Sequence, residues 1–437
     1  MKSIIGKIKS NTMMVNSVYS LSAKAVTMIF FFVFDILCAR ILDTGAYGEW
    51  VYFYAIITII YSVVWFGVNV SSKIFIAKAE NSKRMEIFAS ALLLRLIVSL
   101  LLTLIYLIVV TAMWRMQLFD IEKYVHLPQM LLLGSGVVFL NSYSEFFKEI
   151  FVGFIDFKGL LIISSCEYAG YFVFGLIGLV ISKSVYSIIC GFLISLLFTV
   201  LVGFWIIFKK YHLEKKHFRR ESILSEGKNI FQYAKYIALS GIGSILLTEI
   251  DTFMLGYFRE GYDTAVYSIA KQISSKAIHV NLALSTSMMP VFANITVENV
   301  RAKKEQFKKV MLCNGAVTFG ITIFFALLGN FAIRVLYGEK YLFAAEVLYF
   351  LLPYYVISSF SKFLVLFLDY QNKAKVRSIV FFVTIVFDVI LNAVLIPGFG
   401  AVGASVATDL ALTPYLVFLF IETGIIFQAY QKRGENV

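Results

Sequence analysis

The stretch KKYHLEKKHFRRESILSEG, residues 209–227, is the longest polar segment in a chain otherwise dominated by apolar runs. Hydrophobic residues make up 60% of the 437 residues and charged residues 15%, which is more apolar surface than a soluble domain can cover. Apolar runs long enough for membrane-spanning helices lie on both sides of the stretch. The sequence therefore predicts an all-α integral membrane protein that is divided at this polar segment.

Twelve apolar runs predict twelve transmembrane helices, six on each side of the polar segment. We expect an N-terminal six-helix bundle at 1–208, a cytoplasmic basic linker at 209–230 and a C-terminal six-helix bundle at 231–437. Many transporters are built from two such repeats. The predicted helices are residues 14–40, 47–70, 86–113, 128–154, 159–182, 185–208, 231–258, 263–294, 309–336, 343–370, 375–396 and 400–428.

The basic residues in the connecting segments, counted together with those at the helix ends, indicate how the chain is oriented. With the N-terminus inside, the inner segments hold 25 Lys and Arg residues and the outer segments hold six. An excess of this kind is typical of cytoplasmic loops and predicts that both termini face the cytoplasm. The net charge of +12 is therefore mostly a topology signal, and we expect no nucleic-acid partner.

The sequence lacks the common motifs of nucleotide-hydrolysing, metal-dependent and Ser/His/Asp enzymes. It has no P-loop, no HExxH and no plausible Ser/His/Asp set. Its four cysteines fall within predicted helices and lack metal-binding spacing. The short outer loops also argue against a membrane-bound glycan polymerase, which usually needs a sizeable surface outside the membrane. We therefore expect no enzyme, no catalytic residues, no metal site and no cofactor.

Three stretches carry a resemblance to a known family. They are ARILDTGAYGEW (39–50), EIDTFMLGYFREGYDTAVYSIAKQI (249–273) running on to Pro290, and LYGEKYLFAAEVLYFLLP (336–353) together with LIPGFGAVGASVATDLA (395–411). In this order they resemble the Wzx-like polysaccharide repeat-unit flippases (O-antigen or capsule) of the multidrug/oligosaccharidyl-lipid/polysaccharide (MOP) exporter superfamily. Asp43-Thr44 stands where that family usually has Gly-Pro.

The resemblance implies a MATE-like fold and a function. The protein would move undecaprenyl-diphosphate-linked oligosaccharide repeat units from the inner to the outer leaflet of the bacterial inner membrane, by alternating access through a cation-lined cavity. Its partners would be this lipid-linked oligosaccharide, membrane lipid, a polysaccharide polymerase and a chain-length regulator. The alternative is a multidrug/cation antiporter of the same superfamily, against which the intramembrane Lys and Arg residues argue. A lipid II flippase would need more than twelve helices.

Basic residues within predicted helices are candidate ligands for an anionic head group, because an intramembrane charge is functional by default. Lys148 is an exception: Glu145 and Glu149 flank it, so we expect a local ion pair. The residues predicted to bind substrate are Lys24, Arg95, Lys271, Lys276 and Lys362.

Acidic residues within predicted helices indicate a second kind of site. Glu249 and Asp251 are two residues apart, about 200° around a helix, so they cannot face the same side. We expect Asp251 to point inward and Glu249 to face a neighbouring helix. For Asp251 two roles stay open, namely pairing with Lys271 or Lys276 and coupling to H⁺ or Na⁺. The other residues predicted to pair charges or couple ions are Asp35, Glu167 and Asp388.

Overall fold

The computed structural model shows a helical protein in two compact units, Met1–Ile245 and Leu246–Val437. Every regular element in the described part of the chain is a helix, which confirms the predicted all-α class. Pro290, which closes the second motif, lies outside the described residues. The described backbone comprises residues 2–118, 120, 122–288, 292, 295–371 and 373–435, without the side chains of residues 2–13, 239–240, 279–280, 282–288 and 433–435.

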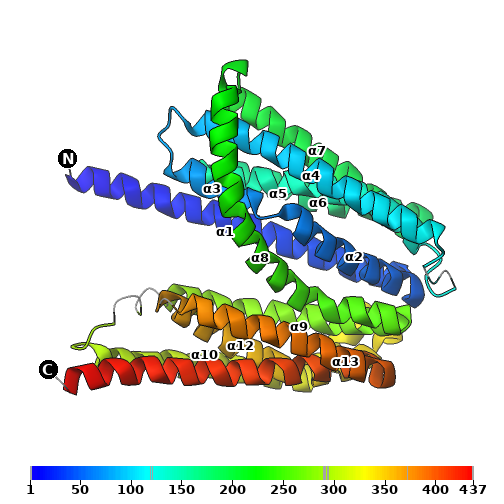
Figure 1. Cartoon of the computed structure of the whole chain (residues 1–437). Coiled ribbons are helices and arrows are strands. Elements are labelled where there is room, and N and C mark those ends of the chain that lie inside the picture. The colour runs from blue at the N-terminus through cyan, green and yellow to red at the C-terminus, as the bar shows by residue number, and fades with distance from the viewer. Residues whose placement is uncertain are drawn as a thin grey trace. The chain divides into compact units, whose positions relative to one another are not determined.

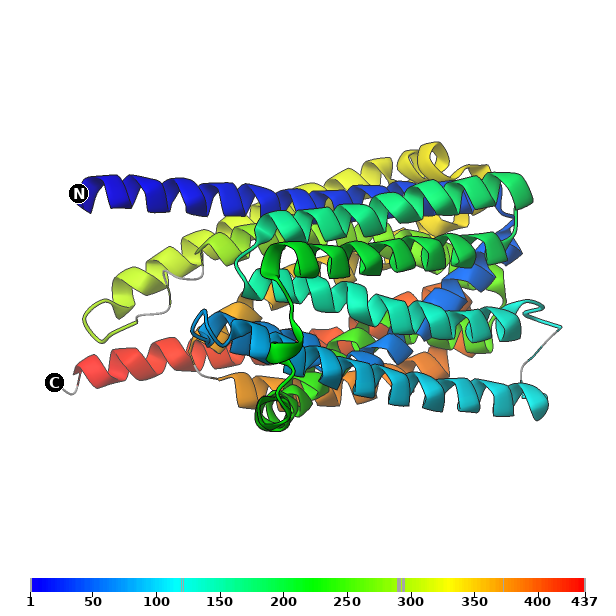
Figure 2. The ribbon, with the colours of Figure 1, turned by 90° about the horizontal axis from the view of Figure 1, so that it is seen from above.

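The first unit is a bundle of long helices that run side by side (Figures 1 and 2). Within it, α6 packs against α1 and α7, and α5 packs against α3 and α4. Fully buried phenylalanines from α4 and α5, such as Phe88 and Phe147, form the centre of its core. Its helices are α1 (Lys2–Ile41), α2 (Thr44–Trp65), α3 (Val68–Lys78), α4 (Arg84–Arg115), α5 (Leu127–Gly153), α6 (Phe157–Ser182), α7 (Val185–Tyr211) and the first part of α8 (Arg220–Phe258).

The second unit is a smaller bundle in which α12 packs against α9, α10 and α13. Gly400 has φ 56° and ψ −133° and divides α13 into two helical segments. The positive φ of Gly400 is one that other residues rarely adopt, and a Cβ atom there would also lie 2.8 Å from an Asp263 carboxylate oxygen, so glycine is strongly favoured. The unit holds the end of α8 with α9 (Gly261–Met288), α10 (Val300–Tyr337), α11 (Phe343–Phe350), α12 (Leu352–Tyr370) and α13 (Ala374–Glu435).

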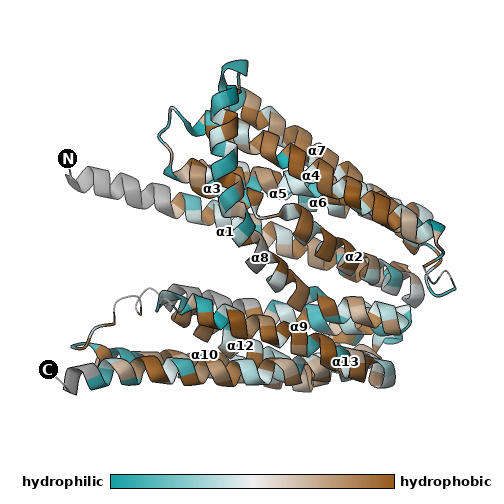
Figure 3. Cartoon of the chain, viewed as in Figure 1, coloured by the Kyte–Doolittle hydropathy of each residue, from teal (hydrophilic) through white to brown (hydrophobic). Residues whose placement is uncertain are grey.

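The helices match the predicted membrane spans. In the described part of the chain, 10 helices are long and apolar enough to cross a membrane. That number counts α13 once, although Gly400 divides it into two segments. It also omits α9, whose sequence is rich in polar residues. With the second segment of α13 and with α9, the number of spans becomes twelve. Figure 3 shows hydrophobic residues along α4 and α7 and hydrophilic ones in the first turns of α8. The twelve-helix membrane fold is therefore confirmed.

The division between the units falls within α8, whereas the sequence placed it in the preceding polar segment. Ile230 and Ala234 of α8 are fully buried in the core of the first unit. They pack near the break between α2 and α3, where Gly67 has a φ of +65°. A Cβ atom at Gly67 would lie 2.5 Å from the backbone oxygen of Ala234. The start of α8 thus belongs to the first unit because glycine lets the two backbones approach closely.

Two aspartates begin helices. Asp43 is the N-cap of α2 and accepts hydrogen bonds from the backbone N–H groups of Gly45 and Ala46, so it supplies a helix start where the resembled family has Gly-Pro. Asp156 caps α6 and also accepts hydrogen bonds from Lys210 Nζ (2.6 Å) and Tyr211 Oη (2.9 Å) at the end of α7. Burial opposes ionisation of Asp156, but these hydrogen bonds outweigh it and hold its pKa below the usual value.

Candidate functional site

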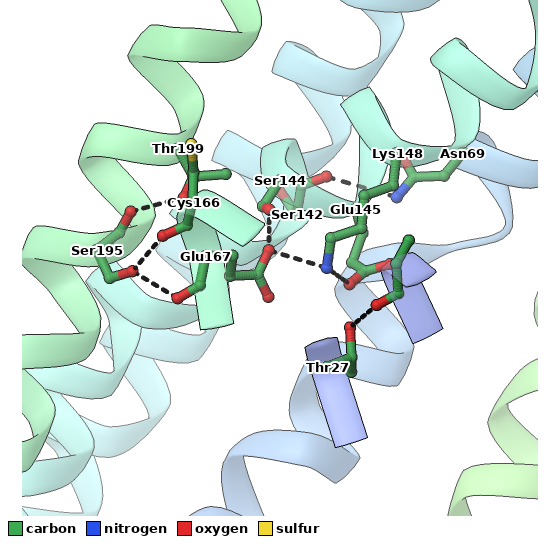
Figure 4. Close-up of polar contacts among 11 residues, drawn as sticks. Thr27, Asn69, Ser142, Ser144, Glu145, Lys148, Cys166, Glu167, Ser195 and Thr199 are labelled. Atoms are coloured by element: carbon green, nitrogen blue, oxygen red, sulfur yellow. Dashed lines mark hydrogen bonds and ion pairs between the residues drawn. The ribbon is translucent and has the colours of Figure 1, made fainter. Parts of the chain in front are cut away.

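A buried ion-pair network joins α5 and α6 in the first unit (Figure 4). Lys148 Nζ lies 2.7 Å from Glu145 Oε1 and 2.9 Å from Glu167 Oε2. Ser144 donates a hydrogen bond to the same Glu167 oxygen. The predicted local pair of Lys148 with Glu145 is confirmed, whereas Glu149 forms its ion pair with Lys73 instead.

This network holds the Glu167 carboxylate and the Lys148 ammonium group largely away from solvent, while the Glu145 side chain is partly exposed. Glu167 is 1% exposed, and the ammonium of Lys148 also lies 4.8 Å from the ring centroid of Tyr168. Ser195 of α7 donates to the backbone oxygen of Glu167 (2.7 Å), which ties a third helix to the cluster. Because unpaired buried charges are costly, Lys148 stabilises this part of the bundle, and Glu167 is a charge-pairing residue in this structure.

Arg95 is a structural cation in this structure rather than one open to substrate. It is 0% exposed, and its guanidinium donates to the backbone oxygens of Val64 (2.6 Å) and Trp65 (3.0 Å). These carbonyls end α2, where a helix leaves its last C=O groups without internal partners. The prediction that Arg95 binds substrate is therefore not supported by its position. Sequence reasoning missed this role because the break after α2 was not foreseen.

The other two predicted residues of the first unit lie on α1 and differ in environment. Asp35 is buried and accepts a hydrogen bond from Tyr47 Oη, at 3.0 Å from each carboxylate oxygen. Lys24 is exposed. Of these two side chains, Lys24 is the one whose surface a bound molecule can reach in this structure.

Asp251 is the centre of a buried polar cluster in the second unit. It is 1% exposed and accepts hydrogen bonds from Tyr267 Oη (2.7 Å), Asn392 Nδ2 (2.8 Å) and Thr408 Oγ1 (3.1 Å). These three donors are neutral, and no ion pair involves Asp251 in the described part of the chain. Pairing of Asp251 with a lysine, one of the two roles left open, is thus not what the structure shows. The ammonium of Lys271 instead donates to the Thr248 backbone oxygen and to Thr252 Oγ1.

Asp388 lies beside the same cluster, and its carboxylate oxygens accept no hydrogen bond from the described residues. It is 0% exposed, and it interacts with Asp251. Asn392 lies one helical turn further along α13, and its Oδ1 atom is buried and also without a partner. Two carboxylates in contact cannot both stay charged unless something compensates them. The cluster therefore suits a shared proton or a hard monovalent cation, which prefers oxygen ligands.

The remaining candidate cations have accessible surface. Lys271 and Lys276 lie on α9 and are partly exposed, and Lys362 on α12 is exposed. Glu249 is also partly exposed and interacts electrostatically with Lys271, while Asp251 on the opposite side of α8 is buried. This difference agrees with the expected opposite orientation of the two acids.

Several polar residues of the Asp251 cluster were not predicted. Tyr267 and Thr408 supply hydroxyl groups from α9 and α13, and Asn392 supplies an amide. The spacing of Asp388 and Asn392, four residues apart on one helix face, is a signal that the sequence offered. In the described residues no group of three or more His, Cys, Asp and Glu side chains suits a metal ion.

Comparisons with known proteins place this fold in a family. The sequence model described as polysaccharide biosynthesis protein matches residues 13–296, and the MatE model matches residues 237–394. Among solved structures, an inward-facing multidrug resistance MATE family transporter of the MOP superfamily has a TM-score of 0.71 at 14% identity, covering 94% of this chain and 99% of the other. The lipid II flippase MurJ, in an inward closed conformation, has a TM-score of 0.65 at 14% identity, covering 96% and 90%.

The curated relatives align with this chain over a smaller part of its length than the solved structures do. An uncharacterized membrane protein of Methanocaldococcus jannaschii is 23% identical over 287 residues, which are 64% of this chain and 56% of the relative. The probable low-salt glycan biosynthesis flippase Agl15 of Haloferax volcanii is 24% identical over 245 residues, 54% of this chain and 47% of the relative. The chain thus spans about half the length of the curated relatives it matches. By the family match over well more than half of its residues, the chain belongs to the polysaccharide biosynthesis protein family.

Proposed function

We propose that the protein is a flippase that moves a polyprenyl-diphosphate-linked oligosaccharide across the membrane. The observation that carries the proposal is the set of lysines with accessible surface within the twelve apolar runs of a multi-pass member of a polysaccharide biosynthesis family. Lys24 in the first unit, and Lys271, Lys276 and Lys362 in the second, would each stabilise a phosphate of the head group as it passes along that unit. The probable flippases among the curated relatives support the same class of activity.

The energetics explain why such lysines are needed. A single charge at the bilayer centre costs about 3 kcal/mol on insertion scales and about 10 kcal/mol or more in simulations. A diphosphate therefore needs compensating cations along its path. Outward movement of one negative charge gains about 2.3 kcal/mol per 100 mV of inside-negative potential. The protein can thus act as a transporter that makes no covalent bond, which fits a family of transporters rather than of enzymes.

Ion coupling is part of the proposal. The buried pair of Asp251 and Asp388, with Asn392 and Thr408, would bind H⁺ or Na⁺ and release it during the transport cycle. Support comes from the unpartnered oxygens of Asp388 and Asn392. An ion bound there would help to return an empty, positively lined carrier to its starting state.

The finer identity of the substrate rests on the motif resemblance alone. We propose undecaprenyl diphosphate as the carrier, an O-antigen or capsule repeat unit as the glycan, and the bacterial inner membrane as the location. The flipped product would then pass to a polysaccharide polymerase and its chain-length regulator. The named curated relatives are archaeal.

The proposal is tested by depleting the protein in its host and labelling the lipid-linked glycan with and without permeabilisation. We expect the glycan to accumulate on the inner leaflet. Wild-type protein should restore outer-leaflet glycan, and a variant with Lys24→Glu and Lys271→Glu should not. Lys375→Glu is a matched charge reversal in the exposed first turn of α13 and should restore it. An unchanged leaflet distribution after depletion would refute the flippase.

A second candidate is a cation antiporter, favoured by the MatE match over residues 237–394. It would export cationic compounds in exchange for the ion held near Asp251. The same depletion strain distinguishes the two functions, because an antiporter predicts increased sensitivity to cationic drugs with an unchanged leaflet distribution of the glycan.

A further inference from the structure

One face of α9 is a stripe of polar side chains with accessible surface. From residue 264 to residue 278, every residue outside the stripe is buried. Successive stripe positions are separated by one or three residues, so they share one side of the helix, and the stripe is about 12 Å long. We call this face the α9 stripe; it consists of Ser268, Lys271, Gln272, Ser275 and Lys276.

The chemistry of the α9 stripe indicates what it contacts. All five side chains are polar, two are cations and none is an acid. Polar and ionisable side chains at membrane depth rarely face hydrocarbon; they face protein or water and mark substrate paths. The stripe is therefore complementary to a polar, anionic molecule and unsuited to lipid tails.

The hydrogen bonding within the stripe leaves specific capacity for a ligand. Gln272 Oε1 is buried and has no hydrogen-bond partner in the described residues. Ser275 donates to the Gln272 backbone oxygen (3.0 Å) and keeps its lone pairs as acceptors. The neighbouring Ser274 is fully buried and donates to the backbone oxygens of Ala270 and Lys271, so it offers no surface for a ligand.

We infer that Gln272 and Ser275 recognise the sugar next to the diphosphate of the lipid-linked substrate, an inference that rests on the proposed flippase function. When the substrate binds, the Gln272 amide turns so that Oε1, which is buried in this structure, accepts a hydrogen bond from a sugar hydroxyl, and Nε2 donates to a second sugar oxygen. Lys276, one turn along from Gln272, neutralises the adjacent phosphate. The two residues are thus specificity-determining, because a site built to pair hydroxyl groups discriminates against a molecule that lacks them.

The test uses purified full-length protein in vesicles with two fluorescent lipids, a polyprenyl diphosphate that carries one hexose and the same lipid without sugar. Binding and transbilayer movement are both measured. For Gln272→Leu with Ser275→Ala, we expect affinity and transport of the sugar-bearing lipid to fall about tenfold, the effect of losing one or two hydrogen bonds. The sugar-free lipid should be unaffected, because the lysines remain. Ser274→Ala is the matched control and should leave both lipids unaffected.

Failure of this inference is distinguishable from failure of the proposed function. If the double variant weakens both lipids equally, or neither, the sugar contact is refuted while wild-type transport still supports the flippase. If wild-type protein binds the lipids but moves neither, the flippase is refuted, and the tenfold difference in binding still decides the role of Gln272 and Ser275. If wild-type protein binds neither lipid, both are refuted.

Discussion

At the scale of single residues, a carboxylate without a hydrogen-bond donor needs a counterion or a proton. Asp388 is such a residue, and its contact with Asp251 makes the need greater. We predict that Na⁺ raises the unfolding temperature of the purified protein and that Asp388→Asn abolishes the effect. A ligand present at about 100 times its Kd stabilises by about 2.7 kcal/mol. The measurement is thermal unfolding in detergent at constant ionic strength, with Na⁺ replaced by choline.

Glu249→Gln is the control for that prediction, because Glu249 lies on the same helix but is partly exposed on the other side. Its Na⁺ response should match the wild type. If Na⁺ has no effect on the wild type, a proton remains as the occupant, and transport should then depend on a pH gradient only while Asp388 is intact. Transport insensitive to both gradients would contradict ion coupling at this cluster.

The Lys148 network gives a second prediction at this scale. Two acids share one cation there, so removing Lys148 leaves the buried Glu167 and the partly exposed Glu145 without their counterion, whereas removing Glu167 leaves the Lys148–Glu145 pair intact. We expect Lys148→Met to lower the free energy of unfolding by about 3–5 kcal/mol and Glu167→Gln to lower it by about 1 kcal/mol. In the double variant part of the loss should be recovered, because the contacting residues are coupled. Additive losses would contradict the network.

At the scale of helices, the sequence predicted lengths well and interruptions poorly. Apolar runs located the spans because hydrocarbon thickness sets helix length. The break at Phe66-Gly67 was not predicted, since no proline or polar run marks it and its cause is the distant Ala234 and Arg95. The same limit applied to the site. Asp251 was identified by its charge, whereas the part played by Asn392 emerges only when α13 is packed beside α8.

The break between α2 and α3 gives a prediction for Gly67. A Cβ atom there would meet the Ala234 oxygen at 2.5 Å, and the positive φ is unfavourable for alanine. Overpacking costs about 1–3 kcal/mol and the left-handed conformation about 1–2 kcal/mol more. Gly67→Ala should therefore strongly destabilise the protein in a thermal unfolding assay. Gly227→Ala is the control on α8, where nothing lies within 4 Å, and it should not destabilise.

The cap of α6 gives a prediction about pH. Because hydrogen bonds hold the pKa of Asp156 below its usual value, its stabilising contribution is complete above the unfolded pKa of about 3.9 and is lost as pH falls through the lower folded value. Asp156→Asn should lower the free energy of unfolding by about 1–2 kcal/mol at pH 7. The gap to wild type should begin to narrow below about pH 4 and should close as pH falls through the folded pKa of Asp156. Glu214→Gln, an exposed ion-pair residue, should show no gap at either pH.

At the scale of the whole molecule, composition and the order of apolar and polar segments along the chain predict the division into two halves. The polar segment at residues 209–227 indicated two halves, and the structure has two compact units with their division 18 residues beyond the end of that segment, after Ile245. The difference arises because the first turns of α8 are polar in sequence yet lead directly into Ile230 and Ala234, which are buried in the first unit. Hydropathy reports which residues can cross a membrane, but it does not report which bundle a long helix packs against.

The orientation of the whole chain is the last prediction. Inner segments hold 25 basic residues and outer segments six, and loops rich in Lys and Arg stay in the cytoplasm. In a variant without its four native cysteines, a cysteine at Lys216 should react with an impermeant maleimide only after permeabilisation. A cysteine at Glu122, in the loop between α4 and α5, should react in intact cells. The opposite labelling pattern would show that the chain has the reverse orientation in the membrane. The predicted cytoplasmic location of both termini would then be wrong.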